Sequence, residues 1–246
     1  MKITSTENDK IKHALQVKET KYIQKYGECF VESEKVTDDL LSQGRVFSAL
    51  FVEESKETKY CKYNPFVVTR EVSKKLSSTV TTDGVFGIVK ISDDSFVVPK
   101  NSFLVLDRIQ DPSNVGAIMR SAVAFGYTEI YMIDCAYPYS SKVIRSSMGH
   151  VFNTKINLIK EDDFIQLAHE KNLYLLSADM DGKPVNKAIK LPGIFGIIMG
   201  NEGQGISDKL QKICHETVSI PIAKEVESLN VSVSAGILMY NLKNRG

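Results

Sequence analysis

Three polar turns, each following an apolar run, contain the side chains best suited to chemistry in this chain. They span residues 106–120, 197–205 and 220–232. Together they offer amide, carboxylate, hydroxyl and guanidinium groups, which can orient a bound molecule and handle a proton. Turns at the carboxyl ends of parallel strands are where open α/β sheets hold ligands. We therefore expect these three turns to specify one ligand site.

The first turn offers an amide and a guanidinium. Pro112 and Ser113 favour a turn. Asn114 follows at the expected start of a helix, where its side chain can cap free backbone amides. Arg120 lies less than two helical turns further on, so both side chains can border one pocket. For an isolated arginine, a solvated surface position is the alternative.

The second turn reads Gly-Asn-Glu-Gly-Gln-Gly over residues 200–205. It lacks the Lys-Ser or Lys-Thr that a phosphate loop needs after its glycines. It also lacks the G-x-G-x-x-G spacing of dinucleotide sites, which disfavours a nicotinamide enzyme. Closely spaced glycines let backbone groups approach a flat ligand. From this segment alone, ligand binding and a purely structural tight turn remain equally open.

The elements that must position these turns alternate between strand and helix patterns over residues 101–246. Strands are expected at 103–109, 129–133, 154–158, 173–178, 194–199 and 218–222. Helices are expected at 115–125, 141–147, 162–171, 207–214 and 231–244. Several strand runs are continuously apolar, as in strands covered on both faces. The pattern predicts an α/β fold with a doubly wound, mostly parallel sheet.

A smaller α/β domain is expected over residues 1–92. Its strands are expected at 30–31, 46–52, 66–68 and 85–91, and its helices at 9–26, 34–42 and 70–76. The polar stretch that follows interrupts both periodicities. We expect residues 93–100 to link this domain to a second one at 101–246.

Length and composition are those of an ordinary globular protein, with 246 residues, 43% hydrophobic and 25% charged. No apolar stretch approaches the roughly 20 residues of a membrane span. The first residues lack the apolar core of a secretory signal, so we expect a cytoplasmic protein. The net charge of +1 does not indicate a nucleic-acid binder, although averaging can conceal a local basic patch.

The four cysteines and four histidines show no metal-ligand spacing. We therefore expect no metal and only reduced thiols. The expected last helix, 231–244, is apolar on more than one face. It is either buried centrally or in contact with a second subunit, and the residues alone favour neither.

Three segments carry a resemblance to a known family: residues 114–122, residues 200–203, and residues 220–222 with 228–233. They resemble, in order and spacing, the three motifs of the SpoU (TrmH) family of RNA ribose 2′-O-methyltransferases, of the SPOUT class. Residues 142–149 resemble a loop of the family. Asn8, Leu15 and residues 76–89 resemble its N-terminal RNA-binding domain, so the resemblance covers nearly the whole chain.

The resemblance implies S-adenosylmethionine as methyl donor, a C-terminal trefoil knot and a homodimer whose active site is completed across the interface. The residues that it places at the cofactor are Gly200, Ile220, Leu229, Glu202 and Gly203. The residues that it places around the reacting ribose are Asn114, Arg120, Glu202, Ser228 and Asn230. Because a guanidinium keeps its proton in proteins, we expect Arg120 to stabilise negative charge or hold a phosphate.

Three positions depart from the family pattern: Lys224 and Ser33 replace common glycines, and Ile23 replaces a frequent arginine. Lys224 affects the third turn, and the other two affect how the N-terminal domain grips RNA. The expected substrate is 23S ribosomal RNA. Transfer RNA is the alternative, and a non-catalytic RNA-binding or assembly protein is a third reading that the intact ribose-site residues disfavour.

Overall fold

The computed structural model describes residues 1–92, 95–185 and 190–243. The chain divides into two compact units, one containing residues 1–93 and 137–149, the other 94–136 and 150–246. This division falls beside the expected linker, whose residues 93–94 lie outside the described residues, as does residue 244 of the expected last helix. The sequence did not suggest that residues 137–149 belong with the first unit.

The first unit contains a five-stranded mixed sheet in the order β1-β4-β3-β5-β2. Its strands are β1 (Lys2–Ile3), β2 (Glu28–Glu32), β3 (Phe47–Glu53), β4 (Phe66–Val68) and β5 (Val85–Lys90). β1, β4 and β3 are parallel, and β5 is antiparallel to both of its neighbours. Its helices are α1 (Asp9–Gln16), α2 (Thr20–Tyr26), α3 (Glu34–Ser42), α4 (Glu57–Tyr60), α5 (Arg70–Leu76) and α7 (Ser141–Ser146), with 3-10 turns η1 (Glu54–Lys56) and η2 (Cys61–Tyr63).

Side-chain caps fix where four of these helices begin. Asn8 caps α1, Ser33 caps α3, Thr69 caps α5 and Ser140 caps α7, each accepting a backbone N–H bond from the first turn. Ser33 occupies a position where the family resemblance expects glycine. Its hydroxyl therefore has a local structural use in this chain.

The single helix expected over residues 9–26 is wrong, because the structure has two. Val17 closes α1, and Glu19 takes an extended backbone conformation (φ −94°, ψ 132°) before α2 begins. Ile11, Val17 and Ile23 are all fully buried. The spacing of buried apolar residues thus continues across the break between α1 and α2, and no glycine or proline marks the break in the sequence.

Residues 137–149 pack on the first unit through α7 and the turn that follows it. Arg145 Nη1 lies 3.7 Å from Glu32 Oε2 at the end of β2. Gly149 has a left-handed backbone (φ +79°), and an added Cβ there would lie 2.6 Å from Val36 Cγ1. This close approach is compatible only with glycine.

The second unit contains a six-stranded sheet in the order β11-β9-β10-β6-β7-β8, and every neighbouring pair is parallel. Its strands are β6 (Phe103–Asp107), β7 (Glu129–Ile133), β8 (Lys155–Leu158), β9 (Leu175–Pro184), β10 (Gly196–Met199) and β11 (Glu216–Ser219). The expected α/β class with a mostly parallel sheet is therefore confirmed. The carboxyl ends of β6, β10 and β11 consequently lie along one edge of the sheet.

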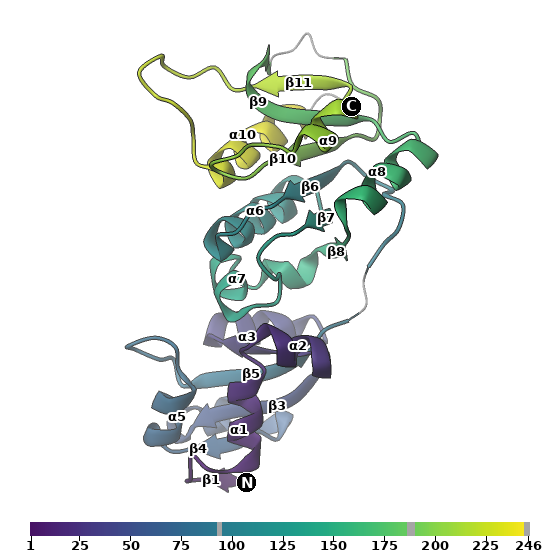
Figure 1. Cartoon of the computed structure of the whole chain (residues 1–246). Coiled ribbons are helices and arrows are strands. Elements are labelled where there is room, and N and C mark those ends of the chain that lie inside the picture. The colour runs from purple at the N-terminus through teal and green to yellow at the C-terminus, as the bar shows by residue number, and fades with distance from the viewer. Residues whose placement is uncertain (93–94, 186–189, 244–246) are drawn as a thin grey trace. The chain divides into compact units, whose positions relative to one another are not determined.

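Helices cover both faces of this sheet. They are α6 (Pro112–Phe125), α8 (Glu161–Glu170), α9 (Asp208–Lys212) and α10 (Val231–Lys243), with a 3-10 turn η3 (His150–Asn153). α6 packs beside α10 on one side, while α8 lies on the other (Figure 1). Phe164 of α8 and Leu210 of α9 share a buried cluster with alternate strand residues such as Val105. No helix in the described ranges is long and apolar enough to cross a membrane.

Candidate functional site

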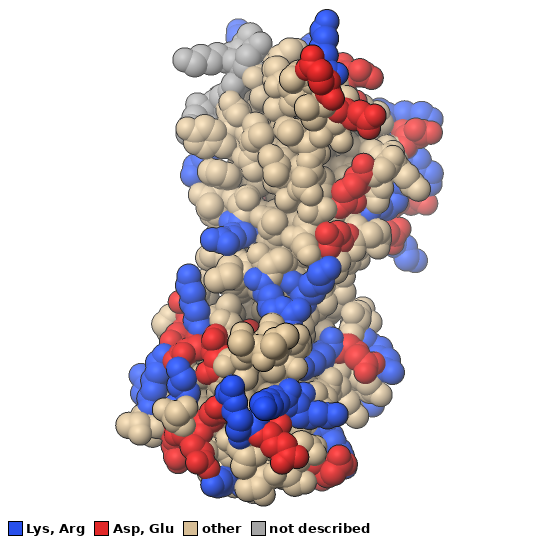
Figure 2. Space-filling model, turned by 90° about the vertical axis from the view of Figure 1, so that its left-hand side faces the viewer, with Lys and Arg blue, Asp and Glu red and all other residues tan. Residues whose placement is uncertain are grey.

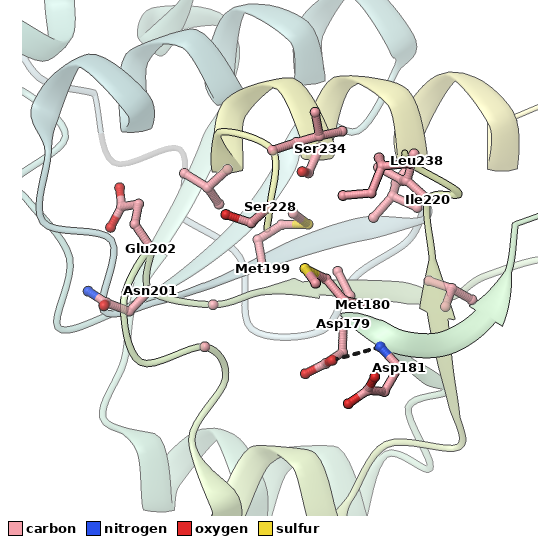
Figure 3. Close-up of a pocket in the computed structure, with 17 residues that line it drawn as sticks. Asp179, Met180, Asp181, Met199, Asn201, Glu202, Ile220, Ser228, Ser234 and Leu238 are labelled. Atoms are coloured by element: carbon pink, nitrogen blue, oxygen red, sulfur yellow. Dashed lines mark hydrogen bonds between the residues drawn. The ribbon is translucent and has the colours of Figure 1, made fainter. Parts of the chain in front are cut away.

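A cavity of about 370 Å³ opens at the carboxyl edge of the second unit's sheet. Four segments line it: residues 178–181 of β9, the turn after β10, the chain after β11, and the first turns of α10 (Figure 3). The lining side chains at its centre include apolar Met199, Ile220 and Leu238. Two of the three turns expected to form a site therefore meet here directly.

The turn after β10 is held in one conformation by its own groups. Asn201 and Gly205 exchange two backbone hydrogen bonds, of 3.0 and 2.9 Å. The Oδ1 atom of Asn201 also accepts the N–H groups of Gly203 and Gln204, at 2.9 and 3.0 Å. Gly205 has a left-handed backbone (φ +67°). The turn thus presents an ordered backbone at the cavity wall.

Gly200 lies where the turn folds back on itself. An added Cβ there would lie 2.4 Å from the carbonyl carbon of Gly205 and 2.4 Å from the nitrogen of Ile206. Only glycine fits, and a flat ligand can approach the bare backbone on the open side. Gly203, by contrast, is not among the cavity-lining residues. Its part in the turn is the N–H bond to Asn201.

Asn114 joins the first turn to the other two. Its Nδ2 donates to Glu202 Oε1 at 2.7 Å, and its Oδ1 accepts from Asn230 Nδ2 at 3.0 Å. Asn114 is only 9% exposed. Both ends of its amide are therefore occupied, which orients Glu202 and Asn230 toward one point.

The expectation that Asn114 caps its helix is wrong. Asp111 is the N-cap of α6, accepting from the N–H of Ser113, and Pro112 occupies the first helical position. Proline suits that position because its missing N–H would be unpaired there in any case. Asn114 sits within the first turn of α6, and its side chain is free to bridge the motifs.

Asn230 has two roles in the third turn. Its Oδ1 accepts from the backbone N–H of Ser232 at 2.9 Å and from that residue's hydroxyl at 2.6 Å, so it caps α10. Its Nδ2 reaches Asn114. The neighbouring Ser228 and Leu229 line the cavity. One short segment thus combines cavity wall, helix cap and polar contact.

Arg120 is not among the residues that line the cavity. It is an exposed residue of α6. Within the described part of the chain, none of the resolved hydrogen bonds or ion pairs involves its guanidinium. The structure therefore brings together eight of the nine expected site residues or their turns and leaves Arg120 apart.

Sequence reasoning missed the segment Asp179, Met180 and Asp181. These residues line the cavity, and the N–H of Asp181 donates to Asp179 Oδ1 at 3.1 Å (Figure 3). With Glu202 they make three carboxylates, and none of the described lining residues is lysine or arginine. The site therefore suits a ligand carrying positive charge better than a phosphate. The signal was weak because an acidic run after a strand usually indicates a solvated loop.

Comparison with known proteins agrees with this geometry. The model of the SpoU rRNA Methylase family matches residues 101–240. An uncharacterized tRNA/rRNA methyltransferase of Synechocystis is 30% identical over 99% of this chain and 93% of its own length. The chain belongs to the SpoU family.

SpoU relatives also match over the full length of the chain. The 23S rRNA (guanosine(2553)-2′-O)-methyltransferase RlmP of Bacillus subtilis is 23% identical over 98% of both chains. A crystal structure of an RNA 2′-O ribose methyltransferase superposes with a TM-score of 0.83 at 26% identity, covering 98% of this chain and 97% of the other. Segments 200–203, 220–222 and 228–233, which resemble the second and third motifs of the family, each contribute residues to the cavity wall.

Among the described residues, no group of three or more His, Cys, Asp or Glu side chains has the arrangement of a metal site.

Proposed function

We propose that this protein is an S-adenosylmethionine-dependent RNA 2′-O-ribose methyltransferase. The observation that carries the proposal is one cavity walled by Gly200, Ile220 and Leu229, beside the polar contact of Asn114 with Glu202 and Asn230. The cavity wall suits the methyl donor, and the polar contact lies where it could orient a sugar hydroxyl.

The cavity fits S-adenosylmethionine in size and charge. Its volume of about 370 Å³ lies in the range of small-molecule sites, about 300–1,000 Å³. Asp179, Asp181 and Glu202 suit the two positive groups of the donor, while Leu229 and Leu238 suit its adenine ring. The bare backbone at Gly200 permits close contact on one side. A dinucleotide or nucleoside triphosphate would meet three carboxylates without a cation.

When bound, the donor supplies an electrophilic methyl group on sulfur. What remains for the protein is to align the ribose 2′-hydroxyl and assist loss of its proton. We propose that Asn114, Glu202, Ser228 and Asn230 orient the ribose. Arg120 stabilises the negative charge that develops on the oxygen or holds the adjacent phosphate, since a guanidinium does not release its proton.

We further propose a homodimer in which Arg120 of one protomer reaches the cavity of the other. α6 and α10 pack together, and between them they carry only two charged residues, Arg120 and Lys243. Val233 and Tyr240 of α10 are 48% and 59% exposed. A broad area of this unit's surface is free of charged side chains in Figure 2. Such a surface suits a subunit contact, and a dimer formed through it would bring the exposed Arg120 of one protomer to the cavity of the other.

The proposed substrate is 23S ribosomal RNA, because the full-length relative RlmP is named as acting on that RNA. Residues 1–92 are proposed as the RNA-binding domain and 101–246 as the methyltransferase domain. Transfer RNA is the second candidate, since the Synechocystis relative is named for either RNA. Cytoplasmic localisation is part of the same proposal.

The decisive experiment supplies purified protein with methyl-labelled S-adenosylmethionine and either ribosomal or transfer RNA lacking its modifications. We expect label on a ribose of ribosomal RNA, located by mass spectrometry. Arg120→Lys should bind the donor normally in calorimetry yet transfer methyl groups poorly. Absence of donor binding by the folded protein would exclude the enzyme and favour an RNA-binding protein.

Complementation tests the shared active site. Arg120→Ala and Asn114→Ala should each be inactive, but mixing them under subunit exchange should restore activity, because one site of each mixed dimer keeps both residues. Homodimers of each variant, taken through the same exchange separately, are the control. Failure to recover activity in mixed dimers detected by native mass spectrometry would place Arg120 in its own protomer's site.

A further inference from the structure

Arg108, directly after β6, has an unusual backbone and an unusual set of contacts. Its φ of 55° is left-handed, a conformation that residues with side chains rarely adopt. Such residues persist where surrounding contacts hold them, and they cluster at functional sites. Arg108 lies within the first of the three expected turns, 106–120, but no role was expected for it.

The guanidinium of Arg108 joins a buried carboxylate to the turn after β10. Its Nε and Nη2 donate to the two oxygens of Asp107, at 3.0 and 3.1 Å. Its Nη1 donates to Gln204 Oε1 at 3.0 Å, and Nη2 also approaches the carbonyl of Gly205 at 3.3 Å. The far end of the turn is thus held by the side-chain donors of Arg108, the residue after β6.

The near end of the same turn is held by the same dipeptide. Asn201 Nδ2 donates to the carbonyl of Arg108 at 2.8 Å. Just beyond the turn, the N–H of Ser207 donates to Asp107 Oδ2 at 2.8 Å. Among the described residues, the side-chain hydrogen bonds that join the 200–205 turn to the rest of the chain run only to Arg108 and Asn114. We call the Asp107–Arg108 pair the loop clamp.

The buried carboxylate of Asp107 anchors the partly exposed guanidinium of Arg108. Asp107 is fully buried, so its charge depends on Arg108 and on the N–H of Ser207 for compensation. The two parallel bonds to the carboxylate fix the plane of the guanidinium. The remaining donors then point at the turn in a fixed direction, which a flexible lysine would not reproduce.

We propose that Arg108 is a positioning residue for methyl transfer, which holds the 200–205 turn so that Gly200 meets the donor and Glu202 meets Asn114. This inference rests on the proposed function, because it concerns the same cavity. Arg108 itself does not line the cavity. It acts through the turn, and its loss should weaken donor binding before any RNA is present.

The test measures the dissociation constant of S-adenosylmethionine by calorimetry, without RNA, for Arg108→Ala, Arg108→Lys and Gln204→Ala. We expect about tenfold weaker binding for Arg108→Ala, the effect of one charged hydrogen bond. Arg108→Lys should recover only part of this loss. The matched control is Lys171→Ala, which removes an exposed cation at the end of α8, before β9 begins and so at the opposite edge of the sheet from the turn.

Gln204→Ala keeps the buried ion pair intact and covers the case in which Arg108→Ala fails to fold. It should weaken donor binding and speed cleavage after the exposed Glu202 by a glutamate-specific protease, relative to Lys171→Ala. Unchanged donor affinity in Gln204→Ala and in a folded Arg108 variant would overturn the inference.

Two other outcomes are distinguishable. A raised KM for RNA with unchanged donor affinity would also overturn the inference and make Arg108 an RNA contact. Lack of donor binding by the wild-type protein would refute the proposed function, and the role of the loop clamp with it. Wild-type binding with unaffected variants would refute the loop clamp alone.

Discussion

Replacing Gly200 by alanine is the sharpest perturbation that the site offers. The added Cβ would lie 2.4 Å from two backbone atoms of the same turn, and an ordinary contact begins near 3.4 Å. The turn must therefore move by about 1 Å, while its hydrogen bonds to Arg108 resist that movement. Overpacking of this kind typically costs about 1–3 kcal/mol.

The expected result is a free energy of unfolding lowered by about 1–3 kcal/mol in urea titration. Donor affinity measured by calorimetry should also fall about tenfold or more, since the displaced backbone is the cavity wall. Gly203→Ala is a matched control for stability, because its added Cβ would meet only Asn201 Oδ1, at 3.7 Å. Equal stability and equal donor affinity of Gly200→Ala and the wild type would refute this account of the turn.

Three further predictions concern other groups. Asn114→Ala should lower stability by about 1–2 kcal/mol, because it removes two hydrogen bonds whose partners, Glu202 and Asn230, are exposed and can bond to water instead. It should also slow single-turnover methylation about 100-fold; normal turnover would contradict the orienting role. Burial alone would raise the pKa of Glu32, but hydrogen bonds from the 77–79 turn outweigh it and lower that pKa. The stability that this lowered pKa contributes is present above the unfolded pKa, about 4.3, and is lost as pH falls through the lower folded value. Acid should therefore reduce the free energy of unfolding more in the wild type than in Glu32→Gln. Equal pH dependence of that free energy in the two proteins, measured by urea titration, would refute this. Burial raises the pKa of Cys135 to about 12, while Cys61 is exposed. Iodoacetamide at pH 8 should therefore label Cys61 before Cys135, as followed by peptide mass spectrometry. Labelling of Cys135 first would contradict the burial of its thiol.

Much of the fold could be predicted because apolar patterns report burial directly. The strands at 129–133 and 66–68 and the helices at 34–42 and 70–76 have the expected bounds. Prediction failed where tertiary contacts decide. β9 continues to residue 184, well past its apolar run, because it pairs with β11 through a register shift.

Strand order and the site's composition depend on contacts that periodicity does not encode. Nothing local shows that β9 lies between β11 and β10, yet this places Asp179 at the cavity. The role of Arg108 in the loop clamp could not be predicted from the sequence, because its partner Gln204 lies 96 positions away. The trefoil knot, like the homodimer, stays a prediction of the family resemblance.

Asn230 links the opening of the first turn of α10 to the hydrogen bonds of the candidate site. The same side chain caps α10 and contacts Asn114, so opening of the first turn of α10 would also release the amide bridge. A molecule resting on Val231 and Ser234, which line the cavity, would oppose that opening. The exchange rates of the backbone hydrogens of Ser232 and Val233 would then measure occupancy, without any label on RNA or donor.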